Sequence, residues 1–402
     1  MWLSLEKHYT GYKSYDYLEA GKDFKTFALV LESNRVKSKV VELTKNEEDR
    51  ANSLLEKYIM ISLHDHPFVL PKDLNNVFEY VKRNRIYTGY HGLSVSGLDG
   101  VFDALLNSFN TITSNLPWRW DSVINELGMK LCDIAHQDYA IRADSVDDIV
   151  KARNEGKVAI VPHLEGASMI ENDPDRIDIL YGLGIRCTGL VYSEANMIGS
   201  GLKEKTDAGL TEFGYTVVDR FNKVGMTIDL SHVGDTTTMD AIGASKKPVL
   251  MTHTGCRSLW DTKRMKSDET LKALAEKGGV LGIEAAPHTT LSPEHPRHSI
   301  DSVIDHFERA VDTIGIDHLG FGPDTLFGDH VGMHHLFASE LGIKGAVSAM
   351  KYEEVEFVNG LENPSEFKNI VRALVKRGYS DQEIEKVMGK NVLRVLRETW
   401  AK

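Results

Sequence analysis

The sequence predicts an α/β fold, a (β/α)8 TIM barrel, from two patterns. From residue 158 onward, short and largely apolar runs alternate with amphipathic helical segments, which is typical of parallel strands joined by helices. Each run ends in a polar residue followed by Gly, Pro or another turn former, as when a buried strand delivers one functional side chain at its carboxyl end. Side chains gathered from several strand ends are typical of a closed barrel.

The length and composition fit one soluble globular unit. A chain of 402 residues, 42% hydrophobic and 26% charged, is long enough for one large barrel or for two ordinary domains. We predict a single domain with an N-terminal cap over 1–56, a barrel core over 57–330, and a C-terminal loop and helices over 331–402. The net charge of −12 argues against nucleic acid and anionic membranes as partners.

Targeting and cysteine patterns favour a cytoplasmic protein. No window approaches the roughly 18 apolar residues that a membrane span needs. The first residues contain no apolar signal-peptide core, and the last ones are typical of an amphipathic helix rather than an anchor signal. Cys132, Cys187 and Cys256 are far apart and odd in number, so they predict neither a disulfide framework nor a CxxC zinc site.

The first half of the chain is less regular than the second. Residues 39–58 have helical apolar spacing, and the apolar run 59–63 predicts a strand that ends at His64. Within 89–106 we expect a second strand that runs into a helix, and 122–141 again has helical spacing.

From residue 158 the alternation of strands and helices is regular. Strands are predicted at 158–165, 185–192, 226–231, 248–253, 279–286 and 318–324. Helices are predicted at 174–184, 211–225, 237–245, 269–278 and 299–315. With the two earlier strands this makes eight, and 363–402 adds two amphipathic helices outside the barrel. An open doubly wound sheet is the alternative, but the sequence has neither a G-x-G-x-x-G turn between strand and helix nor a Walker A loop.

Side chains that bind metals stand at the ends of several apolar runs. They are His64, His66, Glu165, His232, His253 and Asp324. Four imidazoles and two carboxylates that meet at one end of a barrel predict a metal centre. His64 and His66 lie on one face of their strand because strand side chains alternate, and Asp65 points the other way. An exposed turn is the alternative for this segment.

The remaining candidates complete a two-metal pattern. Glu165 could bridge two ions, and we interpret His163, on the same side but deeper, as a core residue or a support for the centre. Taken singly, His232 could be a residue at a helix N-terminus, and His253 could be a hydrogen-bonded core residue. At the ends of successive strands, they resemble the second half of a two-metal site. Asp324 stands where a carboxylate could meet a metal-bound water.

The segments that carry these residues resemble the membrane (renal-type) dipeptidases, peptidase family M19 of the amidohydrolase superfamily. The segments are LHDHPFVLP, HLEGA, GLTEFGYTVVDRFNKVGMTIDLSHVG, PVLMTHTGCRSLWDTKRMKSDE and HLGFGPD. The resemblance implies a barrel of the metal-dependent hydrolase type with two zinc ions. It also implies cleavage of dipeptides by a metal-bridging hydroxide, tolerance of a D-residue at the C-terminal position, and a homodimer.

The resemblance also assigns roles to single residues. His64 and His66 would bind the first zinc, His232 and His253 the second, and Glu165 would bridge them.

Two further residues acquire roles in the same way. Asp324 matches the family's proton-transferring aspartate, and Arg264 matches the arginine that contacts the substrate carboxylate. Its guanidinium suits bidentate pairing with a carboxylate.

Three positions depart from the family pattern. His66 stands where the family usually has Asp, which leaves the centre more positive and should lower the pKa of a metal-bound water. Tyr192 replaces the histidine that stabilises the oxyanion, and its phenol could donate a hydrogen bond there but cannot carry positive charge. Ala286 replaces a tyrosine, so the substrate pocket can differ from that of the family.

These departures keep other hypotheses open. The same centre could act as an amidohydrolase on N-acyl amino acids, lactones or another small amide or ester. A catalytically silent barrel that binds a small ligand or a partner is a third hypothesis, against which the complete set of candidate ligands argues. We interpret His330, His334 and His335 as an exposed active-site loop, with pocket lining or an extra metal site as alternatives.

Overall fold

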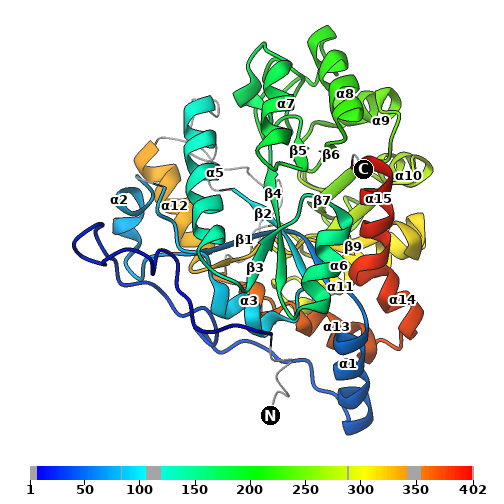
Figure 1. The fold of residues 1–402 in the computed structure, drawn as a ribbon. Coiled ribbons are helices and arrows are strands. Elements are labelled where there is room, and N and C mark those ends of the chain that lie inside the picture. Colours follow the sequence, from blue (N-terminus) through cyan, green and yellow to red (C-terminus); the bar gives the residue numbers. More distant parts are fainter. Residues whose placement is uncertain (1–6, 83, 106–118, 288, 342–354, 401–402) are drawn as a thin grey trace.

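The strands form one curled parallel sheet that is surrounded by helices (Figure 1). The computed structural model describes residues 7–82, 84–105, 119–287, 289–341 and 355–400. Within these residues the sheet has ten strands in the order β10-β1-β2-β4-β5-β6-β7-β8-β9, and β3 pairs with β4. All pairings between these strands are parallel, which confirms the predicted α/β barrel class.

The strands are short and almost entirely buried, which explains why they read as apolar runs rather than as alternating ones. Their bounds are β1 Ile61–Val69, β2 Gly100–Ala104, β3 Ala140–Arg142, β4 Val158–Leu164, β5 Cys187–Gly189, β6 Thr227–Asp229, β7 Leu250–Thr254, β8 Val280–Ile283, β9 Leu319–Phe321 and β10 Leu326–Phe327.

The barrel closes through the segment that follows β9. There β10 pairs with β1, and His66 lies opposite Leu326. The amide of His66 donates to the carbonyl of Thr325 at 2.8 Å, and the amide of Asp324 donates to the carbonyl of His64 at 3.0 Å. The carboxylate of Asp65 accepts from the amide and hydroxyl of Thr325 at 2.9 and 2.7 Å. The first and last strands are therefore joined where the candidate site residues lie.

The helices cover the outside of the sheet and one end of the barrel (Figure 1). Trp400 follows the last helix, and its Nε1 donates to the hydroxyl of Thr227 at the start of β6, at 3.0 Å. None of the helices in the described ranges is long and apolar enough to cross a membrane. Their bounds are α1 Lys45–Lys57, α2 Val77–Val81, α3 Tyr90–Ser96, α5 Trp120–Ala135, α6 Val146–Asn154, α7 Asp175–Gly182, α8 Glu212–Val224, α9 Asp235–Ala244, α10 Asp268–Glu276, α11 Ile300–Ile314, α12 His330–Leu341, α13 Lys368–Lys376, α14 Asp381–Glu385 and α15 Asn391–Thr399.

The region around the second strand differs from the prediction. Helix α3 occupies the segment expected to begin a strand, and β2 follows it. Gly89 and Gly92 allow this segment to pack closely on the ring of Phe327, because a Cβ would lie 2.2 Å from the ring at Gly89 and 2.3 Å from it at Gly92. Packing of that ring against the helix outweighs the local apolar pattern. A strand followed by a helix was expected within 89–106, and the structure has the reverse order, helix α3 and then β2.

Two smaller differences lie at the edge of the sheet and near the C-terminus. Strand β3 was not predicted, and it adds an edge to β4 at the end of the segment with helical spacing. The C-terminal part has α13, α14 and α15 where two helices were expected, and a π-helical turn over Lys386–Lys390 joins the last two. Gly389 in that turn permits a close approach to β1, because a Cβ there would lie 2.3 Å from the carbonyl oxygen of Ile59.

Candidate metal centre

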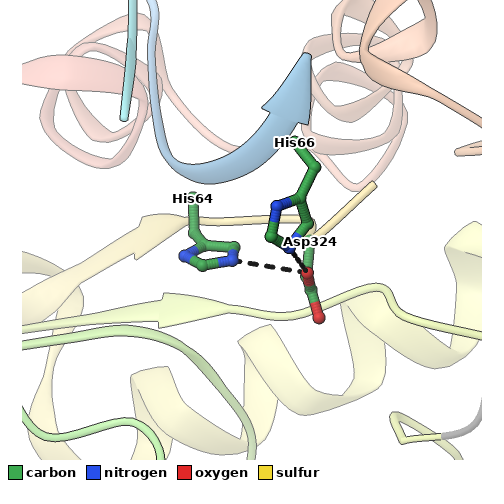
Figure 2. Close-up of side chains that lie close together, drawn as sticks. All are labelled: His64, His66 and Asp324. Atoms are coloured by element: carbon green, nitrogen blue, oxygen red, sulfur yellow. Dashed lines mark ion pairs between the residues drawn. The ribbon is translucent and has the colours of Figure 1, made fainter. Parts of the chain in front are cut away.

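The side chains of His64 and His66 leave β1 on one face and meet Asp324 (Figure 2). The Oδ1 atom of Asp324 lies 3.4 Å from Nε2 of His64 and 3.2 Å from Nε2 of His66. This agrees with the predicted alternation, since Asp65 between them points to the barrel seam instead. Three ligand-type side chains thus converge from the first and last barrel strands.

The backbone of Asp324 is unusual for a residue with a side chain. Its φ of +59° lies in the left-handed region, which few residues other than glycine adopt and which Asp and Asn tolerate best. Strain of this kind is often found at functional sites, where the surrounding structure holds a side chain in one direction. Here the bond from its amide to His64 holds the turn in place and directs the carboxylate toward the two histidines.

Glu165, directly after β4, faces both halves of the cluster. Its Oε1 lies 3.7 Å from Nε2 of His66, and its Oε2 lies 3.1 Å from Nε2 of His232 and 3.6 Å from Nε2 of His253. The two latter Nε2 atoms are 3.0 Å apart. Two nitrogen ligands of one tetrahedral zinc ion are about 3.3 Å apart. Gly189 on β5 makes room, because a Cβ there would lie 2.0 Å from the carbonyl oxygen of Glu165.

Hydrogen bonds behind the rings determine which nitrogen faces the cluster. Nδ1 of His66 lies 3.0 Å from the carbonyl oxygen of Ala104, which can only accept, so this nitrogen carries the hydrogen. The hydroxyl of Thr252 donates to Asp229 at 2.9 Å and therefore accepts from Nδ1 of His253 at 2.8 Å. Nε2 of His66 and of His253 thus present lone pairs to carboxylate oxygens. Because a ring-nitrogen lone pair and a carboxylate oxygen are both acceptors, each of these contacts needs a proton or a metal ion between its two atoms.

Burial and charge set the protonation of the histidines. Burial lowers the pKa of His64 to about 3 and the pKa values of His232 and His253 well below the ordinary range, so these rings are neutral. Burial also disfavours a charge on His66, but the hydrogen bond and charge of Asp324 outweigh it and raise the pKa of His66 to about 9. The cluster therefore favours a positive charge at the position between the carboxylates.

The donor set fits divalent metal ions. Two groups have ligand atoms that all lie within 4.8 Å of one another, namely His64, His66 and Asp324, and His64, Glu165 and His253. Imidazole nitrogens and carboxylate oxygens are common ligands of zinc and related ions. Within the described residues, Nε2 of the buried His64 has no hydrogen-bond partner, and a ring nitrogen that binds a metal ion needs none. The structure brings the six predicted residues together, and their assignment to individual ions stays a prediction.

Asp229, the last residue of β6, is a buried carboxylate that the sequence analysis did not identify. It accepts hydrogen bonds from the amide and hydroxyl of Ser231 and from the amide of Thr252. Its Oδ2 lies 3.5 Å from Nε2 of the buried His163. Burial opposes its charge, but the contact with His163 and these hydrogen bonds hold the pKa of Asp229 well below its usual range. Asp229 therefore orients His253 through Thr252, as carboxylates behind metal ligands commonly do.

The sequence carries only a weak indication of Asp229. It lies two residues before Ser231 in the strand segment TIDLSH, so both side chains share one face. His163, interpreted as a core residue or a support for the centre, is fully buried and packs edge-on against His64, with ring centroids 5.3 Å apart.

Tyr192 lies against the second half of the cluster. Its ring stacks on the ring of His232 with a centroid distance of 4.1 Å and an interplanar angle of 21°. Burial raises the pKa of its hydroxyl well above the usual value, so the phenol keeps its proton and remains a hydrogen-bond donor. Its predicted contact with an oxyanion stays a prediction.

Arg264 lies behind the second half of the cluster and is held by backbone and charge. Its guanidinium donates to the carbonyl oxygens of Ser231 at 3.1 Å and His253 at 2.7 Å. It also forms an ion pair with Glu284, with Nη2 and Oε1 3.1 Å apart. Glu284 follows β8 and was not identified from the sequence. Ala286, two residues later, is fully buried.

The histidines after β10 do not form the exposed loop that we expected. They lie in helix α12, where the side chains of residues four apart are neighbours, and the rings of His330 and His334 are 4.8 Å apart. His335 is exposed, but His330 is buried, and burial lowers its pKa to about 3. The charges of His334, Asp324 and His66 also act on the pKa of His330.

Comparison with known sequences gives a consistent result. The sequence profile of the membrane dipeptidases (peptidase family M19) matches residues 48–336 and 338–401. Dipeptidase tcpJ of Claviceps purpurea is 30% identical over 265 residues, which cover 65% of this chain and 56% of that protein. Dipeptidase verJ of Clonostachys rogersoniana is 29% identical over 276 residues, 67% of this chain and 64% of that protein. The match therefore spans less than two thirds of either relative.

Solved structures share the fold. An amidohydrolase from Pseudomonas aeruginosa superposes with a TM-score of 0.73 at 25% identity and covers 88% of this chain and 99% of its own. A metallo peptidase from Rhodobacter sphaeroides, liganded with a phosphinate mimic of the dipeptide L-Ala-D-Ala, superposes with a TM-score of 0.66 at 19% identity and covers 85% of this chain and 99% of its own.

Proposed function

The chain belongs to the membrane dipeptidase family, peptidase family M19, and from this premise we propose that it is a zinc-dependent dipeptidase. We propose that two zinc ions are bound by five residues of the cluster, His64, His66, Glu165, His232 and His253, with Asp324 beside them. We propose that the substrate is a small dipeptide, with a D-residue accepted at its C-terminal position. The mimic of L-Ala-D-Ala bound to the Rhodobacter sphaeroides peptidase supports the choice of this substrate class.

One observation carries the proposal. The hydrogen on Nδ1 of His66 is bound by Ala104, so Nε2 faces Asp324 and Glu165 at 3.2 and 3.7 Å, and the raised pKa of His66, about 9, means that this position favours a cation, either a proton or a metal ion. Acceptors that face one another in a buried site are stable when a cation lies between them. In this proposal His66 ligates the metal although the family usually has Asp at this position.

The chemistry divides between the metal ions and the residues of the chain. Bound divalent ions would polarise the scissile carbonyl and lower the pKa of a coordinated water to roughly 7. Asp324 would accept a proton from the attacking water and return it to the leaving amine, and its fixed direction toward the cluster suits that role. Tyr192 would donate its hydroxyl hydrogen to the developing oxyanion. Arg264 would orient the carboxyl-terminal side of the substrate.

A second candidate function keeps the centre and changes the substrate. Ala286 and Tyr192 replace the residues of the family pattern, and Glu284 pairs with the arginine expected to bind the substrate carboxylate. These features favour a small amide or ester without a free carboxylate, such as a lactone or an N-acyl amino acid whose carboxylate is blocked.

Metal analysis combined with hydrolysis assays tests the proposal. The purified protein should contain two zinc ions per chain, and it should hydrolyse L-Ala-L-Ala and L-Ala-D-Ala until a chelator removes the metal. Two metal ions without dipeptide hydrolysis would support the second candidate. One ion or none after incubation with zinc would contradict the two-metal proposal.

A further inference from the structure

Lys266 is fully buried beside the turn that carries His232. Its Nζ donates to the carbonyl oxygen of Val233 at 2.6 Å and lies 3.4 Å from Oγ1 of Thr238, so its partners are a carbonyl and a hydroxyl rather than a carboxylate. Lysine is rarely buried in this way, because its ammonium group loses its hydration. A methionine would fill a similar volume without that loss, so packing alone does not explain a lysine at this position.

The backbone of Lys266 is fixed next to the end of β7. Its amide donates to the carbonyl of Gly255 at 3.0 Å, and its carbonyl accepts from the amide of Arg257 at 2.9 Å. The side chain therefore extends from the end of the strand that carries His253 to the turn after β6 that carries His232. Lys266 thus joins the two segments whose histidines are proposed to bind the same ion.

The turn that carries His232 is held through three consecutive carbonyl groups. The carbonyl before His232 accepts from Arg264 at 3.1 Å. The carbonyl of His232 itself accepts from the amide of Leu202 at 3.0 Å. The third is the carbonyl of Val233, to which Lys266 donates. Fixed peptide groups restrict the backbone dihedrals of the turn, and these dihedrals determine the direction in which a side chain leaves it.

His232 depends on this backbone support more than His66 and His253 do. Within the described residues, Nδ1 of His232 has no hydrogen-bond partner, whereas the same atom of His66 and of His253 has one. Histidines that bind metal ions almost always donate this second N–H to a partner that fixes the ring. The ring of His232 is held instead by its backbone and by the stacked ring of Tyr192.

We propose that Lys266 is a positioning residue that keeps His232 oriented toward its metal ion by holding the carbonyl of Val233. Burial lowers the pKa of Lys266 to about 7, but the ammonium and the neutral amine both carry N–H hydrogens, so either form makes this bond. The inference rests on the proposed function, because it concerns a ligand of the proposed metal centre.

Zinc titration of Lys266→Met tests this role. Methionine removes the donor, and the hydroxyl of Thr238, 3.3 Å from the Val233 carbonyl, can still satisfy that carbonyl. Zinc-free protein is titrated in the presence of a competing chelator, and His232→Ala identifies the ion that His232 binds. In Lys266→Met the Kd of that ion should rise roughly 10- to 100-fold, the usual effect of losing a group behind a metal ligand, while the other ion keeps its Kd.

The matched control is Lys368→Met. Lys368 in α13 also donates to a backbone carbonyl, that of Val95 in α3 at 2.8 Å, and burial lowers its pKa to about 8. This variant should leave the Kd of both ions unchanged. The melting temperature of each zinc-free variant reports separately how much the substitution destabilises the fold.

Three results would refute the role of Lys266. One is an unchanged Kd for the ion that His232 binds. Another is an equal loss of affinity for both ions together with a lower melting temperature, which is the effect of a purely structural residue. If Lys266→Met does not fold, Lys266→Gln, whose side chain is one bond shorter, is titrated with the same expectation. The third refuting result is that neither variant folds.

The same titration separates this inference from the proposed function. If wild type binds two ions, or one ion that His232→Ala weakens, but hydrolyses no dipeptide, the proposed function fails and the comparison still decides the role of Lys266. If wild type binds no ion, or His232→Ala weakens none, there is no ligand for Lys266 to orient, and the inference is refuted.

Discussion

Replacing Asp324 with Asn tests the proton-transfer role with little disturbance of the backbone. The left-handed φ of +59° is one that Asn also tolerates, whereas Ala there would add strain of about 1 kcal/mol. The hydrogen bond from the Asp324 amide to the His64 carbonyl involves only backbone atoms, so it remains in the variant. The substitution thus removes the negative charge that lies 3.2 Å from His66 and 3.4 Å from His64, and keeps the shape.

The expected loss follows from the proposed chemistry. General acid–base catalysis by a positioned side chain contributes roughly 10²- to 10⁴-fold, so Asp324→Asn should lower kcat on L-Ala-D-Ala by that factor, about 3–5 kcal/mol in activation free energy. Zinc content by elemental analysis should stay at the wild-type value. Asp317→Asn, at an aspartate paired with Lys386 on the surface and 60% exposed, is the control and should retain full activity.

Two results would refute this reasoning. If Asp324→Asn keeps more than about a tenth of the wild-type kcat, the carboxylate does not transfer the proton, because even the lower limit for such catalysis is roughly 10²-fold. If the variant loses zinc, Asp324 is a metal ligand, as its position in a group with His64 and His66 allows.

Three further predictions concern the second half of the cluster and the buried histidines. His232→Ala should remove one of two zinc ions per chain and abolish turnover, and retention of both ions in elemental analysis would exclude His232 as a ligand. Tyr192→Phe should lower kcat by roughly 10²- to 10³-fold with little change in KM if the hydroxyl binds the oxyanion, and a drop of less than about threefold would mean that the ring only packs on His232. Burial lowers the pKa values of His298 and His306 to about 4, so the unfolded chain binds more protons than the folded one between pH 6.5 and 4, and the free energy of unfolding should fall as the pH falls through that window. Urea unfolding at pH 7 and 5 measures this. His306→Gln should reduce the difference between the two free energies of unfolding by roughly 2 kcal/mol, whereas an unchanged difference would show that His306 is not the titrating group.

The alternation of strands and helices could be predicted because parallel strands buried on both faces leave a strong sequence signal. The signal fails where tertiary contacts decide the local structure. Helix α3 depends on the ring of Phe327, which approaches Gly89 and Gly92 from more than 230 residues away in sequence. Strand β10, with only two residues, exists because β1 offers it an open edge. Neither contact is visible in a local window of sequence.

The candidate site could be predicted where a functional residue follows an apolar run directly in the sequence. Glu165, His232 and Asp324 follow their strands closely, as expected, but β1 does not end at His64: it continues to Val69, and His64 and His66 lie within it, as His253 lies within β7. All six residues meet in the structure. The residues behind them were not found, because their importance arises from pairing across strands.

Asp229 acquires its role only because β7 places the hydroxyl of Thr252 beside it. Glu284 stands out only because it pairs with Arg264, which lies 20 residues earlier in the chain. The histidines of α12 were expected in a loop but lie in a helix. Gly328 precedes this helix and Gly332 lies in its first turn, so the local sequence does not favour a helix there.

The seam between β1 and the segment after β9 also has a consequence for biosynthesis. Asp65 and Thr325, which join the two sides, are 260 residues apart in the chain. At 5–20 residues per second, a ribosome needs roughly 13–52 s to add that length. Throughout this interval the two histidines of β1 exist without the aspartate they will face. The complete six-residue cluster therefore exists only in chains that have grown past the segment after β9.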